Sequence, residues 1–201
     1  TVYIHSMRTI PIAPYPASPL PWPPQAPVKG RGTAWDMAHR FNTVQRVVED
    51  DGWGALDIDA QSQTPPPSTV VLDERARSIL ASNDSPDIGF DLSINPYRGC
   101  EHGCVYCYAR PTHSYLNLSP GVDFETRIIA KVNAAERLRA AFMAPGYEPQ
   151  MLNIGSATDA YQPAERRLRI TRSVIEVMRD FDHAFSLITK SSGIERDIDL
   201  I

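Results

Sequence analysis

The three cysteines of the chain, Cys100, Cys104 and Cys107, lie within one stretch of eight residues. Their spacing is C-x3-C-x2-C, and Tyr106 directly precedes the last sulfur. Three thiolates this close are able to bind one metal centre, and three ligands leave one coordination position open. An open position favours a metal centre that carries out chemistry over one that only stabilises the fold.

Two kinds of metal centre fit three neighbouring thiolates. A zinc site needs a fourth ligand, which His102 or His113 would supply. Structural zinc sites usually have two ligand pairs on separate turns, and this chain has no second cysteine pair. A [4Fe–4S] cluster with one free iron matches three cysteines better than a zinc site does. Clusters that only carry electrons normally take four cysteines, so a cluster held by three leaves one iron without a protein ligand. The missing fourth cysteine favours a small molecule on the free iron, and both metals stay open at this point.

The sequence around the cysteines resembles the radical SAM superfamily, whose C-x3-C-x2-C motif has an aromatic residue before the third cysteine. Residues 95–110, which read NPYRGCEHGCVYCYAR, are similar to its spore photoproduct lyase-like (DNA repair photolyase-like) branch. Further segments similar to that branch are residues 85–87 (SPD), 123–126 (DFET), 158–165 (TDAYQPAE) and 189–191 (TKS). The resemblance extends over residues 85–201.

The resemblance implies a partial (βα)6-type barrel that binds one [4Fe–4S] cluster and S-adenosyl-L-methionine. Cys100, Cys104 and Cys107 would ligate three irons, and the methionine part of the cofactor would chelate the fourth. Reductive cleavage of S-adenosylmethionine would give a 5′-deoxyadenosyl radical that abstracts hydrogen from an unknown substrate, in a lyase-like reaction. A flavodoxin- or ferredoxin-like electron donor is implied as a partner, and nucleic acid is suggested as a substrate by the branch name alone.

The resemblance also implies a set of residues that bind S-adenosylmethionine. They are Tyr106, Gly155, Ser156, Thr158, Lys190 and Ser191. Tyr106 would contact the adenine, and Lys190 would neutralise the carboxylate of the cofactor. Small residues at 155–158 would let the backbone approach the methionine part. The alternative for this stretch is that it only caps the turn before Glu165.

Three residues beside these motifs have two interpretations each. Asp159 and Tyr161 lie either on the substrate side or in a structural role, and Tyr108 either handles a radical or packs. The chain also departs from spore photoproduct lyases, which use a cysteine outside the cluster motif as hydrogen donor, since its 201 residues contain no further cysteine. Repair of spore photoproduct itself is therefore not expected. The alternatives to an enzyme are a non-catalytic iron–sulfur or zinc binding module and an inactive truncated fragment.

The elements that position these residues follow the alternating pattern of an α/β fold. Short apolar segments predict strands at residues 90–95, 127–132, 151–155 and 185–189. Helices are predicted over 133–143 and 165–181 and from residue 194 onward, and Asn133 and Glu136 have the spacing of a capping box. In such folds the C-terminal ends of the strands carry the active site. We therefore expect the cysteine loop, residues 155–159 and residues 189–191 to face one another.

The chain divides into three parts by composition. Residues 1–28 carry eight of the 18 prolines and predict a disordered tail. Residues 29–89 predict a loosely structured N-terminal extension with one short helix at 73–81. Residues 90–201 predict the N-terminal part of the barrel, truncated after about three βα units. The start at Thr1 and the end at Ile201, inside an expected helix, favour a fragment of a longer protein.

Net charge, apolar stretches and cysteine content indicate which partners and which cellular compartment to expect. A net charge of −4 and a pI of about 5.7 argue against a basic surface over the whole chain for nucleic acid. No apolar stretch reaches the length needed to cross a bilayer, and no secretion signal is evident at the start of the chain. The clustered, odd number of cysteines favours a reducing compartment, so we expect a cytoplasmic protein.

Overall fold

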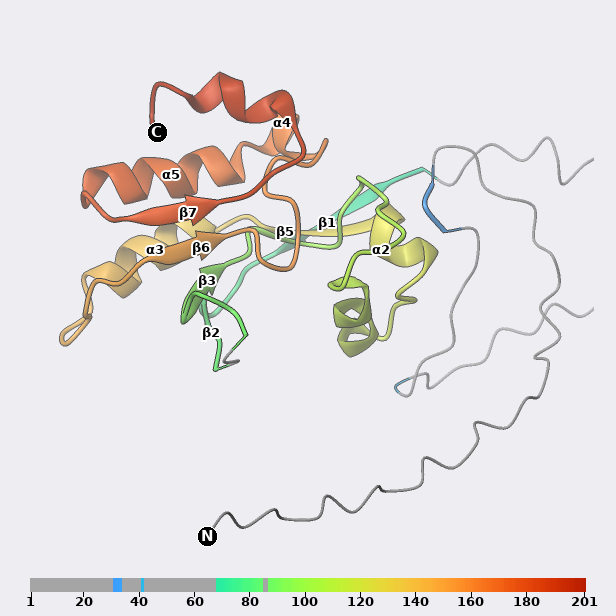
Figure 1. Cartoon of the computed structure of the whole chain (residues 1–201), viewed down its shortest axis with the longest axis horizontal. Helices are drawn as coiled ribbons and strands as arrows, with labels where there is room; N and C mark the ends of the chain where they lie inside the picture. The colour runs from blue at the N-terminus through green and yellow to red at the C-terminus, as the bar shows by residue number, and fades with distance from the viewer. Residues whose placement is uncertain (1–30, 34–40, 42–67, 85–86) are drawn as a thin grey trace, which may run out of the picture.

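The computed structural model describes residues 31–33, 41, 68–84 and 87–201 (Figure 1). The tail expected at residues 1–28 lies outside the described residues. The fold is mixed α/β, and both of its sheets combine parallel and antiparallel pairs. None of the helices in the described part of the chain has the length and apolar character needed to span a membrane.

The larger sheet has the strand order β2-β3-β6-β7. Its strands are β2 (Leu80–Ser82), β3 (Leu92–Ile94), β6 (Leu152–Ile154) and β7 (Phe185–Leu187). β3, β6 and β7 are parallel to one another, whereas β2 is antiparallel to β3. The strands predicted around residues 90–95, 151–155 and 185–189 are thereby confirmed, each somewhat shorter than expected.

The smaller sheet has the order β1-β5-β4, with β1 (Val70–Glu74), β5 (Arg127–Lys131) and β4 (Tyr97–Arg98). β1 runs parallel to β5 over five residue pairs, and β4 runs antiparallel to it. The strand predicted at 127–132 is confirmed. The helix predicted at 73–81 is wrong, because that segment holds the end of β1, a short connection and β2.

Pairing with distant residues explains why residues 73–81 are not helical. β1 is fixed by its ladder with β5, more than 50 positions along the chain. Beyond its end, the side chain of Asn133 accepts a hydrogen bond from Ala76 N at 2.8 Å and donates one to Ala76 O at 2.9 Å. Both backbone groups of Ala76 are therefore satisfied without a helix.

The same contact corrects the capping box predicted at the start of the following helix, α3 (Ala134–Phe142). Asn133 does occupy the N-cap position, but its side chain makes no capping hydrogen bond. Its amide is committed to Ala76, so a tertiary contact has replaced the local one. The helix itself is confirmed.

The helix predicted over 165–181 is two helices, α4 (Glu165–Leu168) and α5 (Ile170–Asp180). The break lies at Arg169, whose φ of 53° is left-handed. The carboxylate of Glu165 accepts the backbone N–H groups of Thr171 at 3.0 Å and Arg172 at 3.2 Å. These are the N2 and N3 donors of α5, so Glu165 caps α5 from the preceding helix.

Three further short helices complete the described part: η1 (Arg110–Leu116), α2 (Val122–Thr126) and η2 (Ser192–Asp197). The helix expected from residue 194 is thus a 3-10 helix that starts slightly earlier. Arg172 of α5 forms an ion pair with the buried Asp197 of η2. Arg196 pairs with both Asp197 and Glu165, which fixes η2 on the two helices before it.

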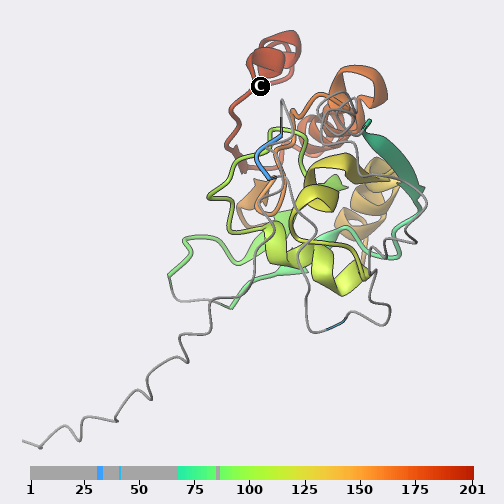
Figure 2. The same ribbon diagram turned by 90° about the vertical axis from the view of Figure 1, so that its right-hand side faces the viewer.

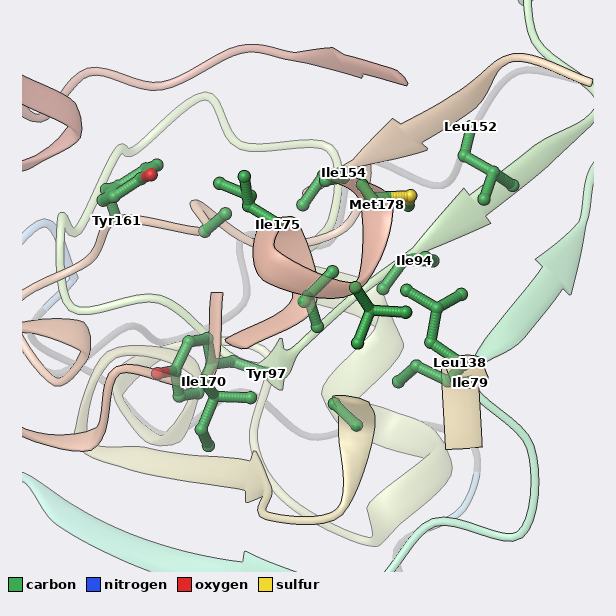
Figure 3. Close-up of a cluster of buried hydrophobic side chains, with 14 of the residues drawn as sticks. Ile79, Ile94, Tyr97, Leu138, Leu152, Ile154, Tyr161, Ile170, Ile175 and Met178 are labelled. Carbon is green, nitrogen blue, oxygen red and sulfur yellow. The ribbon is translucent and has the colours of Figure 1, made fainter. Parts of the chain in front are cut away.

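The main core lies between α3, α5 and the larger sheet (Figure 3). Ile94, Ile154, Leu138, Ile175 and Met178 are fully buried within it. β6 is buried along its whole length, as a central strand covered on both faces must be. Figure 1 shows α3 and α5 beside β6 and β7, with α2 at the other end of the described structure. The core therefore anchors the strands whose C-terminal ends carry the predicted site.

We expect Ile175→Ala to lower the free energy of unfolding by about 2–5 kcal/mol, because it removes a fully buried side chain and leaves a cavity. The matched control is Ile198→Ala, whose side chain is 75% exposed and which should change stability by no more than about 0.5 kcal/mol. Urea denaturation followed by circular dichroism measures both values. Equal effects of the two substitutions would contradict this description of the core.

Candidate active site with three cysteines

The loops that follow β4, β6 and β7 line one pocket of about 310 Å³. All three cysteines lie on its wall, together with residues 155–159 and with Thr189 and Lys190. Because β3, β6 and β7 are parallel, their C-terminal ends lie at one edge of the larger sheet. The loops after β6 and β7 start at this edge, and the chain after β3 passes through β4 of the smaller sheet before it forms the cysteine loop. The predicted convergence of the three loops is confirmed.

The three thiols are all free, and Cys100 is the most buried of them. Burial raises the pKa of the Cys100 thiol to about 11, because the thiolate loses its hydration. A bound metal cation would supply the missing stabilisation and deprotonate the sulfur.

Among the described residues, no three histidine, cysteine, aspartate or glutamate side chains form a ready-made metal-ligand group. The chemistry of the donor set is nevertheless that of a soft metal site, because thiolates select zinc or iron–sulfur clusters over hard cations. The three sulfurs share one pocket wall and differ little in sequence position. In residue type, though not as a formed ligand group, the three cysteines therefore fit an iron–sulfur cluster or zinc.

Lys190 brings a positive charge to the cysteines from the loop after β7. Its Nζ lies 3.0 Å from Cys104 Sγ, contacts the Tyr106 hydroxyl and stands 4.4 Å from the centre of the Tyr106 ring. The hydrogen bond to Cys104 raises the pKa of Lys190, so the ammonium form is favoured. This cation favours an anionic group in the pocket, whether a thiolate or a carboxylate of a ligand.

Asp159 joins the three loops through its carboxylate. Oδ1 accepts Thr189 Oγ1 at 2.6 Å and the Tyr161 N–H at 2.8 Å, and Oδ2 accepts the Lys190 N–H at 2.9 Å. His102 of the cysteine loop places Nε2 3.4 Å from Oδ2. Of the two interpretations offered for Asp159, these contacts support the structural one.

The loop after β6 is tied to the cysteine loop through small residues. Gly155 has a φ of +88°, and a Cβ there would stand 2.9 Å from Thr158 O, so the turn needs glycine. The Thr158 hydroxyl donates to Gly99 O at 2.6 Å, directly before Cys100. Ser156 Oγ accepts from Asn95 Nδ2 at 3.0 Å. The Thr158 and Ser156 side chains thus tie this loop to the segment before the cysteines.

Most of the predicted cofactor residues line the pocket: Tyr106, Gly155, Ser156, Thr158 and Lys190. Ser191 does not, because its hydroxyl caps η2 by accepting the Gly193 N–H at 3.1 Å. Tyr108 lines the pocket and donates its hydroxyl to Ser156 O, whereas Tyr161 is buried in the core.

The two histidines considered as zinc ligands lie in different surroundings. His102 lines the pocket beside Asp159. His113 is fully buried in η1, where its Nε2 lies 3.0 Å from Arg127 O. Burial lowers the pKa of His113, so its imidazole is neutral at physiological pH. Of the two, only His102 is placed to reach a metal in this pocket.

Sequence reasoning missed several residues of the site. Three of them line the pocket: Phe90, two residues before β3, Asn153, in the middle of β6, and Ile188, directly after β7. The strands that carry or flank these residues were predicted, so their positions along the chain were informative. Their residue types gave no indication of a functional site. Ile188 is 80% exposed, which leaves an apolar side chain at the pocket rim.

The chain is similar to proteins that are named as uncharacterized. Uncharacterized protein Rv2578c of Mycobacterium tuberculosis is 39% identical over 112 residues, which cover 56% of this chain and 33% of that protein. Uncharacterized protein MJ0683 of Methanocaldococcus jannaschii is 29% identical over 112 residues, which cover 56% of this chain and 40% of that protein. The matching region thus spans between a third and two fifths of these relatives.

No family model matches the chain. No solved structure matches it either. The relatives come from a bacterium and from a methanogen, and their names assign no activity.

We expect Asp159→Asn to loosen the loop that carries Lys190, because an amide cannot accept from all the donors that now meet the carboxylate. Leaving one half-buried donor without a partner costs about 1 kcal/mol, so cleavage after Lys190 by a lysine-specific protease should rise about fivefold. Asp182→Asn is the matched control, since Asp182 is exposed and asparagine tolerates its φ of 49°. Cleavage at the unaltered rate in Asp159→Asn would show that the carboxylate does not hold this loop.

Proposed function

We propose that this chain is part of a radical SAM enzyme of the spore photoproduct lyase-like branch. The observation that carries the proposal is the shared pocket, in which a C-x3-C-x2-C loop meets a lysine and a glycine-containing loop from the ends of parallel strands. Three thiol ligands and a neighbouring cation suit a cluster with one open iron and an anionic ligand beside it.

In this proposal Cys100, Cys104 and Cys107 hold a [4Fe–4S] cluster, and S-adenosylmethionine occupies the rest of the pocket. Together these groups supply one-electron cleavage of a sulfonium C–S bond, which protein side chains cannot perform. Lys190 neutralises a carboxylate, and the backbone at 155–158 lies against the ligand. Tyr106, Tyr108 and Ile188 line the pocket as exposed apolar side chains, which a bound ligand would cover.

The proposed architecture is a partial (βα)6-type barrel that starts near residue 90. The parallel run β3-β6-β7, with α3 and α5 packed beside it, supports this proposal. β1 and β2 precede that boundary and pair with β5 and β3, so residues 70–82 are built into the same two sheets.

The proposed setting is the cytoplasm, where three free thiols stay reduced. A flavodoxin- or ferredoxin-like protein would deliver the electron. The substrate is an organic molecule that loses a hydrogen atom in a lyase-like reaction, and nucleic acid enters as a candidate by analogy with the branch alone.

The proposal is tested by anaerobic reconstitution with iron and sulfide, followed by reduction in the presence of S-adenosylmethionine. We expect 5′-deoxyadenosine to accumulate above the level of a Cys104→Ala control, because loss of one thiolate ligand disrupts the cluster. Liquid chromatography with mass spectrometry quantifies the product. Tight zinc binding together with product no higher than in the control would replace the enzyme by a zinc-binding module.

A second prediction concerns Lys190. We expect Lys190→Gln to weaken S-adenosylmethionine binding to the reconstituted protein about tenfold, because a charge-assisted hydrogen bond is worth about 1.5–3 kcal/mol. Equilibrium dialysis with labelled cofactor measures the affinity, and the iron content shows whether the cluster is kept. Arg167→Gln removes an exposed positive charge on α4 and serves as the control. Equal affinity of Lys190→Gln and the wild type would remove Lys190 from the cofactor site.

A further inference from the structure

Residues 31–33 lie directly against the cysteine loop, although they are some 70 positions away along the chain (Figure 2). We call them the brace. The backbone of Gly32 meets that of Gly103, the residue before Cys104. A Cβ on Gly32 would stand 1.7 Å from Gly103 O and 2.7 Å from Gly103 C, which no side chain could tolerate without a shift of backbone. The close approach of two backbones explains why glycine occupies both positions.

The brace is held by the carboxylate of Glu125, which is fully buried in α2. Oε2 accepts the Gly32 N–H at 2.8 Å, and Oε1 accepts the Thr33 hydroxyl at 3.2 Å. A buried carboxylate needs a positive partner, and Arg110 supplies it through an ion pair with Oε1. The brace thus supplies the remaining hydrogen bonds to a carboxylate that is buried away from water.

Arg110 links Glu125 to the cysteine loop. It is 7% exposed, and its Nε donates to Cys104 O at 3.0 Å. Its Nη1 donates to Gly121 O at 3.1 Å, which fixes the guanidinium against the turn before α2. The backbone of Cys104 is therefore restrained from two sides, by Arg110 at its carbonyl and by Gly32 at the preceding residue.

Arg31 secures the brace at its other end. Its Nη1 donates to Glu125 O at 3.0 Å, and its Nη2 donates to Thr69 Oγ1 at 3.0 Å, just before β1. The brace is thereby linked both to α2 and to the strand that pairs with β5.

We propose that the brace is a positioning element of the metal centre, which fixes Cys104 through Gly103 and through the Glu125–Arg110 pair. Gly32 and Arg31 are its positioning residues, and neither touches the pocket. The inference deepens the proposed function, and it rests on that function only in treating the cysteines as metal ligands. Its structural content, a Cys104 backbone restrained by residues 31–33, holds whatever metal is bound.

The test is the rate at which each thiol of the metal-free protein reacts with a maleimide reagent, resolved by peptide mass spectrometry. We expect Gly32→Ala to speed the labelling of Cys104 about tenfold, because the loop opens more often when its backbone contact is broken. Cys100 should change less than about twofold, since its N–H is bonded to Phe124 O, independently of the brace. Gly89→Ala is the matched control, because a Cβ there meets nothing within 4 Å.

Arg31→Ala serves as a second variant, because it loosens the brace without adding an atom next to Gly103. It should reproduce the selective increase at Cys104, with an unfolding temperature close to that of the wild type. Wild-type labelling of Cys104 in both variants, or equal acceleration at all three cysteines, would overturn the proposal.

The reconstituted protein supplies a separate readout. We expect a chelator to remove iron faster from Gly32→Ala than from Gly89→Ala. If the wild type takes up no iron, the proposed function fails, while the labelling experiment still decides whether the brace holds Cys104.

Discussion

The parallel pairing of β3, β6 and β7 is the constraint on which the rest of the site depends. Ile94, Ile154 and Leu187 lie side by side at the ends of these strands, so the chain that follows each strand leaves the sheet at the same edge. The core holds the strands in this register, since Ile94 and Ile154 are fully buried. A slip by one residue would turn these side chains out of the core and separate the three loops. Stability and site geometry are therefore set by the same contacts.

The converging loops are held together by buried or half-buried polar groups rather than by apolar packing. The Asp159 carboxylate accepts hydrogen bonds from the β7 loop and faces His102. The Glu125 carboxylate accepts hydrogen bonds from the brace and forms an ion pair with Arg110. Each carboxylate is satisfied by several donors, as buried charges must be. Between these two anchors, Cys104 meets Lys190 at 3.0 Å. The thiols thus lie among loops that these carboxylates link to one another.

The sequence predicted those parts of the structure that are decided locally. The strand at 152–154 was predictable from its apolar residues between breakers, and the cysteine loop from its spacing. Residues 73–81 were misjudged, because their conformation depends on pairing with β5 and on the Asn133 side chain. The break at Arg169 was missed for the same reason, since the capping carboxylate of Glu165 gives no signal in a helical pattern. The brace was not predicted from the sequence either, because its contacts join residues far apart in the chain.

In the proposed metal centre, the three thiolates hold a cluster with one iron open to a small molecule. Electron paramagnetic resonance of the reconstituted, reduced protein tests this claim most directly, recorded before and after addition of S-adenosylmethionine. We expect the signal of a reduced [4Fe–4S] cluster, and we expect its g-values to shift when the cofactor binds the open iron. A cluster signal that stays unchanged in saturating cofactor would contradict the claim.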